Sequence, residues 1–210
     1  MLSEQRTGPI SAAPGAVNPG RTDSTGSLVV TDGRARYAEL ARTGKLFFAC
    51  NQAAIVPTAG LSTAAKNYTL YNPLNSGVLV EVVRCIISCT TLPVVSTTVA
   101  TNVFLAGNLS TIQAAPASVA SETVRNALLG GVAGVGLVYN TCTLAATPVA
   151  IRPLLSVDIL TAVGAFSLVH NDEIAGELSL LPGTYISIQA SAATIGLQCS
   201  MTWAETLIPV

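Results

Sequence analysis

The sequence predicts an all-β protein, an antiparallel β-sandwich or jelly roll that follows an extended N-terminal arm, with at most one or two short helices. Half of the residues are hydrophobic but only 5% are aromatic, so the apolar content is mostly Ala, Val, Leu and Ile. Such β-branched and small residues, with many Ser and Thr, suit strands. About eight to ten short candidate strands alternate with turn residues, and no long amphipathic helical pattern occurs.

The charged residues divide the chain into two unlike parts. They make up 10% of the sequence, against about 25% in typical soluble domains. Residues 1–45 carry six cations and four acids, whereas residues 46–210 carry only four cations and seven acids. The sequence therefore predicts an N-terminal arm with a short helical or turn segment over residues 1–45, and a β-sandwich body over residues 46–210.

The arm has the composition of an extended segment. Residues 1–27 contain three prolines and four glycines and show no apolar period, so we expect them to lack a core of their own. Further on, Asp32 is expected to cap a short helix over residues 35–42, which Gly44 ends. Entry into a β-hairpin is the alternative for this stretch.

The body is expected to consist of strands joined by turns. Clusters of Asn, Pro, Gly and Ser predict turns at residues 72–77 and 181–183, and residues 192–194 are a third. Residues 118–129 are the one further helix candidate, with Ser121 and Glu122 near its start. The candidate strands are residues 46–49, 66–71, 78–90, 94–105, 135–144, 149–155, 165–169, 177–180, 185–191 and 196–205.

The sparse charge also bears on partners. An isolated body with so few charges is poorly solubilised, and burial against copies of itself is the simplest remedy. A net charge of −1 gives no electrostatic basis for a nucleic-acid partner. The longest apolar runs, 127–139 and 159–169, fall short of the roughly 18–20 residues that span a membrane, and the first residues lack the apolar core of a signal peptide.

The cysteines are expected to be free, buried thiols. There are five, and only Cys85 and Cys89 are close in sequence. On one strand these two lie about 13 Å apart, which is too far for a disulfide. One histidine and the absence of a Cys-x-x-Cys pair argue against a zinc site. We predict no catalytic, cofactor or metal site and expect the protein not to be an enzyme.

Two further stretches contain residue types that could form a ligand-binding or catalytic site. Residues 130–136 (Gly-Gly-Val-Ala-Gly-Val-Gly) lack the Lys-Ser/Thr of a phosphate-binding loop, so we expect a flexible loop or a tightly packed turn. His170, Asp172 and Glu173 gather the only histidine with two acids, but no nucleophile motif accompanies them. We expect a solvated loop there. With Glu177 these acids offer the alternative of a hard-cation site, and an enzyme acting on a cell-surface polymer would need its paired carboxylates among them.

Trp203 is the only tryptophan of the chain. Alternation along the last predicted strand puts Met201, Trp203 and Glu205 on one face and Thr202 and Ala204 on the other. We expect Trp203 and Met201 to anchor the core or a subunit interface. A platform on which a sugar stacks is the functional alternative for Trp203.

Several short motifs occur along the chain: Gly26-Ser-Leu-Val-Val-Thr-Asp32, Gly33-Arg-Ala-Arg-Tyr37-Ala-Glu39, Gly44-Lys-Leu-Phe-Phe48, Tyr71-Asn-Pro73, Ile151-Arg-Pro153, the Asp172-Glu173 to Pro182-Gly183 stretch, and Met201-Thr-Trp203-Ala-Glu205. Together they resemble motifs of small structural proteins of tailed bacteriophages. The likeness departs from the family pattern at the inserted Ala35-Arg36 and at Ala38, where the family has a second Tyr.

The resemblance is to capsid decoration (cement) and head-fibre proteins with a jelly-roll body. It implies a virion protein, commonly a homotrimer, on the outer surface of the capsid, which stabilises an icosahedral head by bridging neighbouring capsomers of the major capsid protein. The candidate capsid contacts, to shell carboxylates or carbonyls, are Arg6, Arg21, Arg34, Arg36 and Arg42. The alternative is a head fibre or receptor-binding knob that recognises a host glycan, since one fold supports both uses.

Overall fold

The computed structural model describes residues 36–91, 100–108, 114–157 and 168–208. The chain divides into two units, Met1–Ala38 and Glu39–Val210, and all the strands of the described residues belong to the second. Residues 1–35 of the predicted N-terminal arm lie outside the described residues. One short helix, α1 (Ala38–Arg42), forms within the helical stretch that the sequence predicts.

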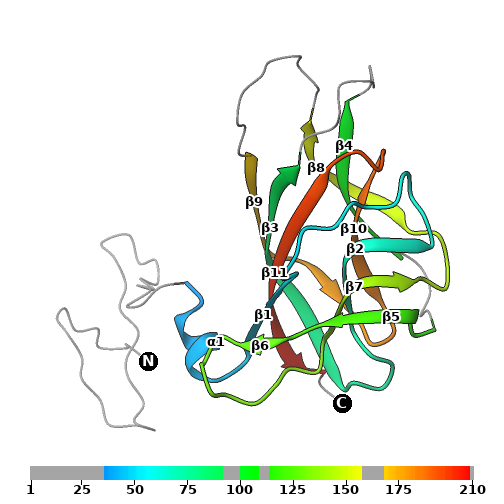
Figure 1. The fold of residues 1–210 in the computed structure, drawn as a ribbon. Helices are drawn as coiled ribbons and strands as arrows, with labels where there is room; N and C mark the ends of the chain where they lie inside the picture. The colour runs from blue at the N-terminus through cyan, green and yellow to red at the C-terminus, as the bar shows by residue number, and fades with distance from the viewer. Residues whose placement is uncertain (1–35, 92–99, 109–113, 158–167, 209–210) are drawn as a thin grey trace, which may run out of the picture. The chain divides into compact units, whose positions relative to one another are not determined.

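The strands form two antiparallel sheets in a curled sandwich, which confirms the predicted fold class (Figure 1). The first sheet has the order β6 (Arg125–Asn126), β1 (Leu46–Cys50), β11 (Gly196–Leu207), β3 (Val78–Thr91) and β9 (Leu168–Leu180). The second has the order β5 (Ala117–Glu122), β7 (Leu137–Thr143), β2 (Ala64–Tyr71), β10 (Tyr185–Ala190), β4 (Thr101–Gly107) and β8 (Val149–Val157).

Alternating side chains build one core between the sheets. In β11, Met201 and Trp203 are 0% exposed, whereas Thr202 between them is half-buried. Ile188 of β10 joins the same cluster from the other sheet. The ring of Phe47 in β1 stacks on Trp203 with 6.4 Å between centroids. Since each large apolar side chain stabilises the fold by about 1.5–3 kcal/mol when buried, this inward row is what holds the two sheets together.

A second, smaller cluster lies on the opposite face of the six-stranded sheet. Neighbours along a strand point to opposite faces, and Tyr71 and Tyr185 follow or precede residues of the main core. The hydroxyl of Tyr185 donates a hydrogen bond to the carbonyl of Ala146 at 2.9 Å. The members of this cluster are Ala65, Tyr71, Tyr139, Cys142, Leu144 and Tyr185.

The predicted helix over residues 118–129 is wrong. Its first half forms strand β5, which pairs antiparallel with β7, and its second half contains the two-residue strand β6, which pairs with β1. Most side chains of β5 are exposed, so the segment has no apolar face that a helix could bury. Pairing with the edges of both sheets therefore overrides the local helical preference.

The predicted loop at His170–Glu173 is wrong as well. These residues lie in the first half of β9, which also contains the predicted strand at 177–180 and residues 168–169 of the strand predicted at 165–169, whose first three residues lie outside the described ones. Glu173 is opposite Arg84 and Leu178 is opposite Val82, so the four residues between them face only one residue of β3. This bulge, residues 174–177, interrupts the pattern by which a strand is recognised.

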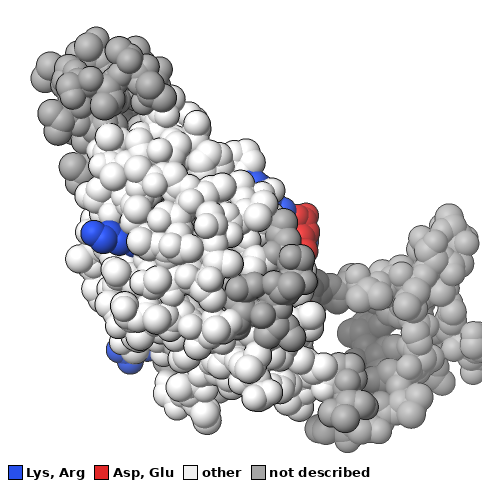
Figure 2. Space-filling model, turned by 90° about the vertical axis from the view of Figure 1, so that its right-hand side faces the viewer, with Lys and Arg blue, Asp and Glu red and all other residues white. Residues whose placement is uncertain are grey.

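Charged side chains are sparse on the sandwich. In the six strands of the second sheet only Lys66, Glu122 and Arg152 are charged. The face seen in Figure 2 is accordingly covered by uncharged residues over most of its described area, and the few charged side chains lie near its left and right edges. The low charge of the sequence is thus a property of the surface and not only of the core.

Candidate functional site

The connection between β6 and β7 is the most specifically built surface feature of the described residues. It comprises residues 127–136, which we call the glycine loop. The sequence predicts a flexible loop or a tightly packed turn here, and the structure supports the second form, because buried side chains hold the loop at both ends.

Glu205 holds the C-terminal end of the loop. Its side chain is on the inward face of β11 and the residue is 8% exposed. The carboxylate accepts hydrogen bonds from the backbone N–H of Val135 at 2.9 and 3.0 Å and of Gly136 at 2.9 Å. The indole N–H of Trp203 donates to the same carboxylate at 3.0 Å. Hydrogen bonds to a charged group are strong, so this end of the loop is tied to the core.

Asn126 of β6 holds the N-terminal end. Its amide nitrogen donates to the carbonyls of Gly44 and Val132, both at 2.9 Å, and its oxygen accepts from the N–H of Leu128 at 2.8 Å. The residue is 6% exposed. One buried amide therefore closes the loop onto itself and onto the segment before β1.

Other atoms approach three glycines of the loop closely: Gly131 beside Asn126, and Gly134 and Gly136 beside the core. A Cβ on Gly134 would lie 2.7 Å from Oε1 of Glu205 and 2.8 Å from the ring of Phe47. A Cβ on Gly136 would lie 3.0 Å from the indole nitrogen of Trp203. Any side chain at these positions would displace the core contacts that fix the loop.

The fixed loop displays apolar side chains to solvent. Leu129 and Val132 are each 85% exposed. Leu128 and Val135 of the loop are exposed too, at 46% and 40%, as is Leu137 at the start of β7, at 41%. Single exposed apolar residues are ordinary, but a run of them on one rigid loop makes this loop a candidate interaction site. The sequence shows the glycines and valines of this loop, but not that a carboxylate 70 residues further along holds it.

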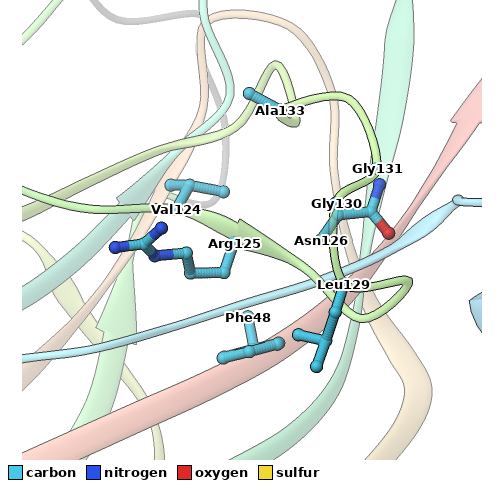
Figure 3. A pocket seen from close by; sticks show the side chains of 8 residues that line it. All are labelled: Phe48, Val124, Arg125, Asn126, Leu129, Gly130, Gly131 and Ala133. Carbon is cyan, nitrogen blue, oxygen red and sulfur yellow. The ribbon is translucent and has the colours of Figure 1, made fainter.

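A hollow of about 560 Å³ lies beside the loop (Figure 3). Its floor includes Phe48, which is half-buried on the outward face of β1, and its wall includes the exposed Leu129. Arg125 of β6 is exposed and lies opposite Phe48 in the strand register. The lining residues are Phe48, Val124, Arg125, Asn126, Leu129, Gly130, Gly131 and Ala133.

The predicted capsid contacts are only partly within the described residues. Arg6, Arg21 and Arg34 lie outside them. The guanidinium of Arg36 lies 5.9 Å from the ring centroid of Tyr37. Arg42 binds Glu39 through two hydrogen bonds, of 2.9 and 2.5 Å, and the hydrogen bond to Glu39 raises the pKa of Arg42. Arg42 is thus already paired within α1.

The two predicted anchors lie in the core. Trp203 and Met201 are both 0% exposed, so neither presents a surface to a second molecule. Because the indole ring stacks on Phe47 and its N–H is bound by Glu205, Trp203 offers no platform for a sugar.

The acids around His170 form an ion cluster instead of a loop. Arg152 of β8 donates to Glu177 at 2.6 Å and to Asp172 at 3.5 Å, and the hydrogen bond to Glu177 raises the pKa of Arg152. This cluster links the edge strands of the two sheets. Among the described residues no group of three or more His, Cys, Asp or Glu side chains could hold a metal ion.

None of the five cysteines forms a disulfide, and four of them are buried. Burial raises the pKa of Cys85 to about 12. A thiol with so high a pKa carries almost no thiolate near neutral pH and is therefore a poor nucleophile. These cysteines pack as small apolar side chains.

Comparison with protein-family models, curated proteins and solved structures found no match for this chain. In the described part of the chain, no helix has the length and apolar character needed to cross a membrane.

Proposed function

We propose that this protein is a virion structural protein that decorates the outer surface of an icosahedral phage head and bridges neighbouring subunits of the major capsid protein. The observation that carries the proposal is the glycine loop, which is fixed by buried side chains yet apolar at its exposed positions. The exposed apolar side chains of such a loop are more favourably buried in a stable protein interface than left in contact with solvent.

The sparse charge of the sandwich supports the same function. A surface with few charges is at risk of non-specific association unless partners cover it. A protein that is packed into a shell, next to copies of itself and of the capsid protein, has its surface covered in this way. The proposal therefore includes a homotrimer, whose members share the burial.

Two pairs of the motifs that resemble phage structural proteins are in contact. Arg152 of the Ile151-Arg-Pro153 motif binds Asp172 and Glu177 of the late acidic motif. The backbone of Asn72, in the Tyr71-Asn-Pro73 motif, accepts a hydrogen bond from Gly183 at 2.8 Å. Motifs far apart in the sequence thus form common framework contacts, which supports reading them as parts of one pattern.

A trimer can attach firmly to the capsid even if each of its three arms binds the capsid only weakly. In a trimer, every arm raises the effective concentration of the other two at the capsid surface, so the total binding exceeds that of one arm by a large factor. We assign this grip to Arg6, Arg21, Arg34, Arg36 and Arg42, with carboxylates and carbonyls of the shell as their partners. Arg42 would exchange its pairing with Glu39 for one of these partners.

Copy counting on purified particles tests the proposal. Quantitative mass spectrometry gives the ratio of this protein to the major capsid protein. A ratio that matches a fixed number of copies per capsomer supports decoration of the head. A few copies per particle would favour the head fibre or receptor-binding knob that recognises a host glycan, and absence from particles would overturn both.

A further inference from the structure

We propose that the hollow beside the glycine loop binds a segment of the partner protein in which an apolar side chain is followed closely by a carboxylate. The apolar side chain would lie on Phe48 and Leu129, and the carboxylate would pair with Arg125. This inference deepens the proposed function, on which it rests for the identity of the partner, but its chemistry depends only on the hollow.

The apolar part of the site is Phe48 together with Leu129. Phe47 and Phe48 are neighbours on β1, and while Phe47 packs on Trp203 in the core, Phe48 points to the outward face. Leu129 is 85% exposed at the rim of the hollow. The volume of about 560 Å³ is in the range of sites that bury a compact ligand or several side chains.

The polar part of the site is Arg125. The other polar side chain in the lining, Asn126, already uses both donors and its oxygen for backbone groups of Gly44 and of the loop. Among the described residues Arg125 makes no side-chain hydrogen bond or ion pair, whereas Arg42 and Arg152 each bind a carboxylate. Figure 3 shows the side chain of Arg125 among the lining residues, near Val124 and Phe48. A planar guanidinium at the edge of an apolar hollow selects a carboxylate.

The occupant is a protein segment because of the extent of the exposed apolar surface. A small anionic molecule in the hollow would leave Val132, 85% exposed, and Leu128 uncovered on the same loop. A chain that crosses the hollow covers the floor and the loop together. A second copy of this chain is the competing occupant, and the experiment below separates it.

The direct test uses the full chain, isotope-labelled, with a capped peptide Gly-Ala-Leu-Glu-Ala-Gly as the probe. We expect the peptide to shift the amide resonances of Gly130, Gly131 and Ala133. The peptide with Gln in place of Glu should bind about tenfold more weakly, as the loss of about 1.4 kcal/mol implies. Shifts confined to other parts of the protein, or equal affinities for the two peptides, would overturn the proposal.

Variants then assign the contacts. Arg125→Glu should weaken the Glu peptide at least tenfold and remove its advantage over the Gln peptide, and Leu129→Ala should weaken both peptides about tenfold. Lys66→Glu is the matched control, because it reverses an exposed charge on β2 outside the hollow. Unchanged thermal melting of each variant shows that the fold is intact. Equal losses for Arg125→Glu and Lys66→Glu would contradict a specific site.

Binding to heads that lack the protein separates this inference from the proposed function. If the peptide maps to the hollow but heads are not bound, the proposed function fails and the site remains. If heads bind wild type and Arg125→Glu equally and the peptide does not bind, the site fails and the function remains. If Arg125→Glu dissociates an oligomer of the free protein, the occupant is a second copy, and the inference of a partner segment is wrong.

Discussion

At the scale of single residues, a buried carboxylate is stable only where hydrogen bonds replace the water that it loses. Glu205 meets this condition through the N–H groups of Val135, Gly136 and Trp203. The same bonds determine where the glycine loop lies. Glu205, which the inward-outward alternation of β11 places on the core side, thus fixes the position of the glycine loop. The alternation pattern of the strands does not describe that loop.

Glu205→Gln should therefore loosen the loop without unfolding the sandwich. The neutral amide has one acceptor oxygen in place of two and puts an NH₂ group against N–H donors, so we expect a loss of about 1–3 kcal/mol in the free energy of unfolding. Hydrogen exchange at the amides of Val135 and Gly136 should accelerate. Glu122→Gln, which keeps an acceptor for the amide of Asn140, is the control, and equal exchange in both variants would contradict the role of Glu205.

The buried hydroxyl of Tyr185 predicts a loss of stability at alkaline pH. Burial raises the pKa of Tyr185 to about 12, against about 10 in an unfolded chain. Between these values the unfolded state has released the proton and the folded state retains it, so the free energy of unfolding falls as the pH rises.

Urea titrations of wild type and Tyr185→Phe at about pH 9 and about pH 11 measure this effect. At the lower pH the variant should be less stable, because it lacks the hydrogen bond to Ala146. It should lose less stability than wild type on going to the higher pH, and the comparison cancels other groups, such as Cys85. A parallel decline of the two proteins would show that Tyr185 is not responsible.

At the scale of elements, β9 is an edge strand of 13 residues, and a long edge invites pairing with other chains. Three features interrupt this edge: the acids at 172 and 173, the bulge over residues 174–177, and Arg152, which binds Asp172 and Glu177. The same features explain why the sequence predicts a loop there. Charges and an Ala-Gly pair are typical of loops, and only the pairing with β3 shows that they belong to a strand.

The backbone of the bulge in β9 is strained at Ala175, and substitutions can test this. Ala175 has a φ of 54°, a conformation that costs an L-residue roughly 1–2 kcal/mol. Ala175→Gly should relieve it and, after the greater freedom of Gly in the unfolded chain, stabilise the protein by about 0.5–1 kcal/mol. Gly176→Ala, at a φ of 89°, should destabilise it. Urea unfolding of the pair is decisive, because changes of the same sign would argue against the bulge conformation.

The wrong helix at residues 118–129 has a different cause. Ser121, Glu122 and the alanines nearby are compatible with a helix, and nothing local opposes it until the glycines at 130 and 131. The strand conformation of this stretch is determined by two sheet edges: β5 pairs with β7 and β6 pairs with β1, and without these pairings β7 and β1 would be edge strands. Edges of sheets arise only from the complete topology, so a local pattern cannot reveal them.

At the scale of the whole molecule, composition and alternation were sufficient for the fold class, most strand positions and the inward row of β11. They were insufficient for the site. The hollow combines Phe48, the end of β6 and the glycine loop, which come together because β6 pairs with β1. A two-residue strand is too short to give a periodic pattern in the sequence, so its pairing could not be predicted. Three of the predicted capsid contacts lie outside the described residues: Arg6, Arg21 and Arg34.

The sparse charge of the sandwich leads to a prediction for the free protein. If uncharged surface drives the association of copies, the recombinant chain should sediment as a trimer at micromolar concentration, and it should remain one in about 1 M salt. Interactions between exposed charges are largely screened over a Debye length of about 3 Å at that ionic strength, whereas apolar burial is not weakened by salt. Analytical ultracentrifugation at low and high salt measures both properties. A trimer that dissociates in high salt would show that charges hold it, with the ion cluster at Arg152 as the first candidate. A folded protein that stays monomeric would show that the uncharged surface does not drive association, and that the capsid protein must cover it alone.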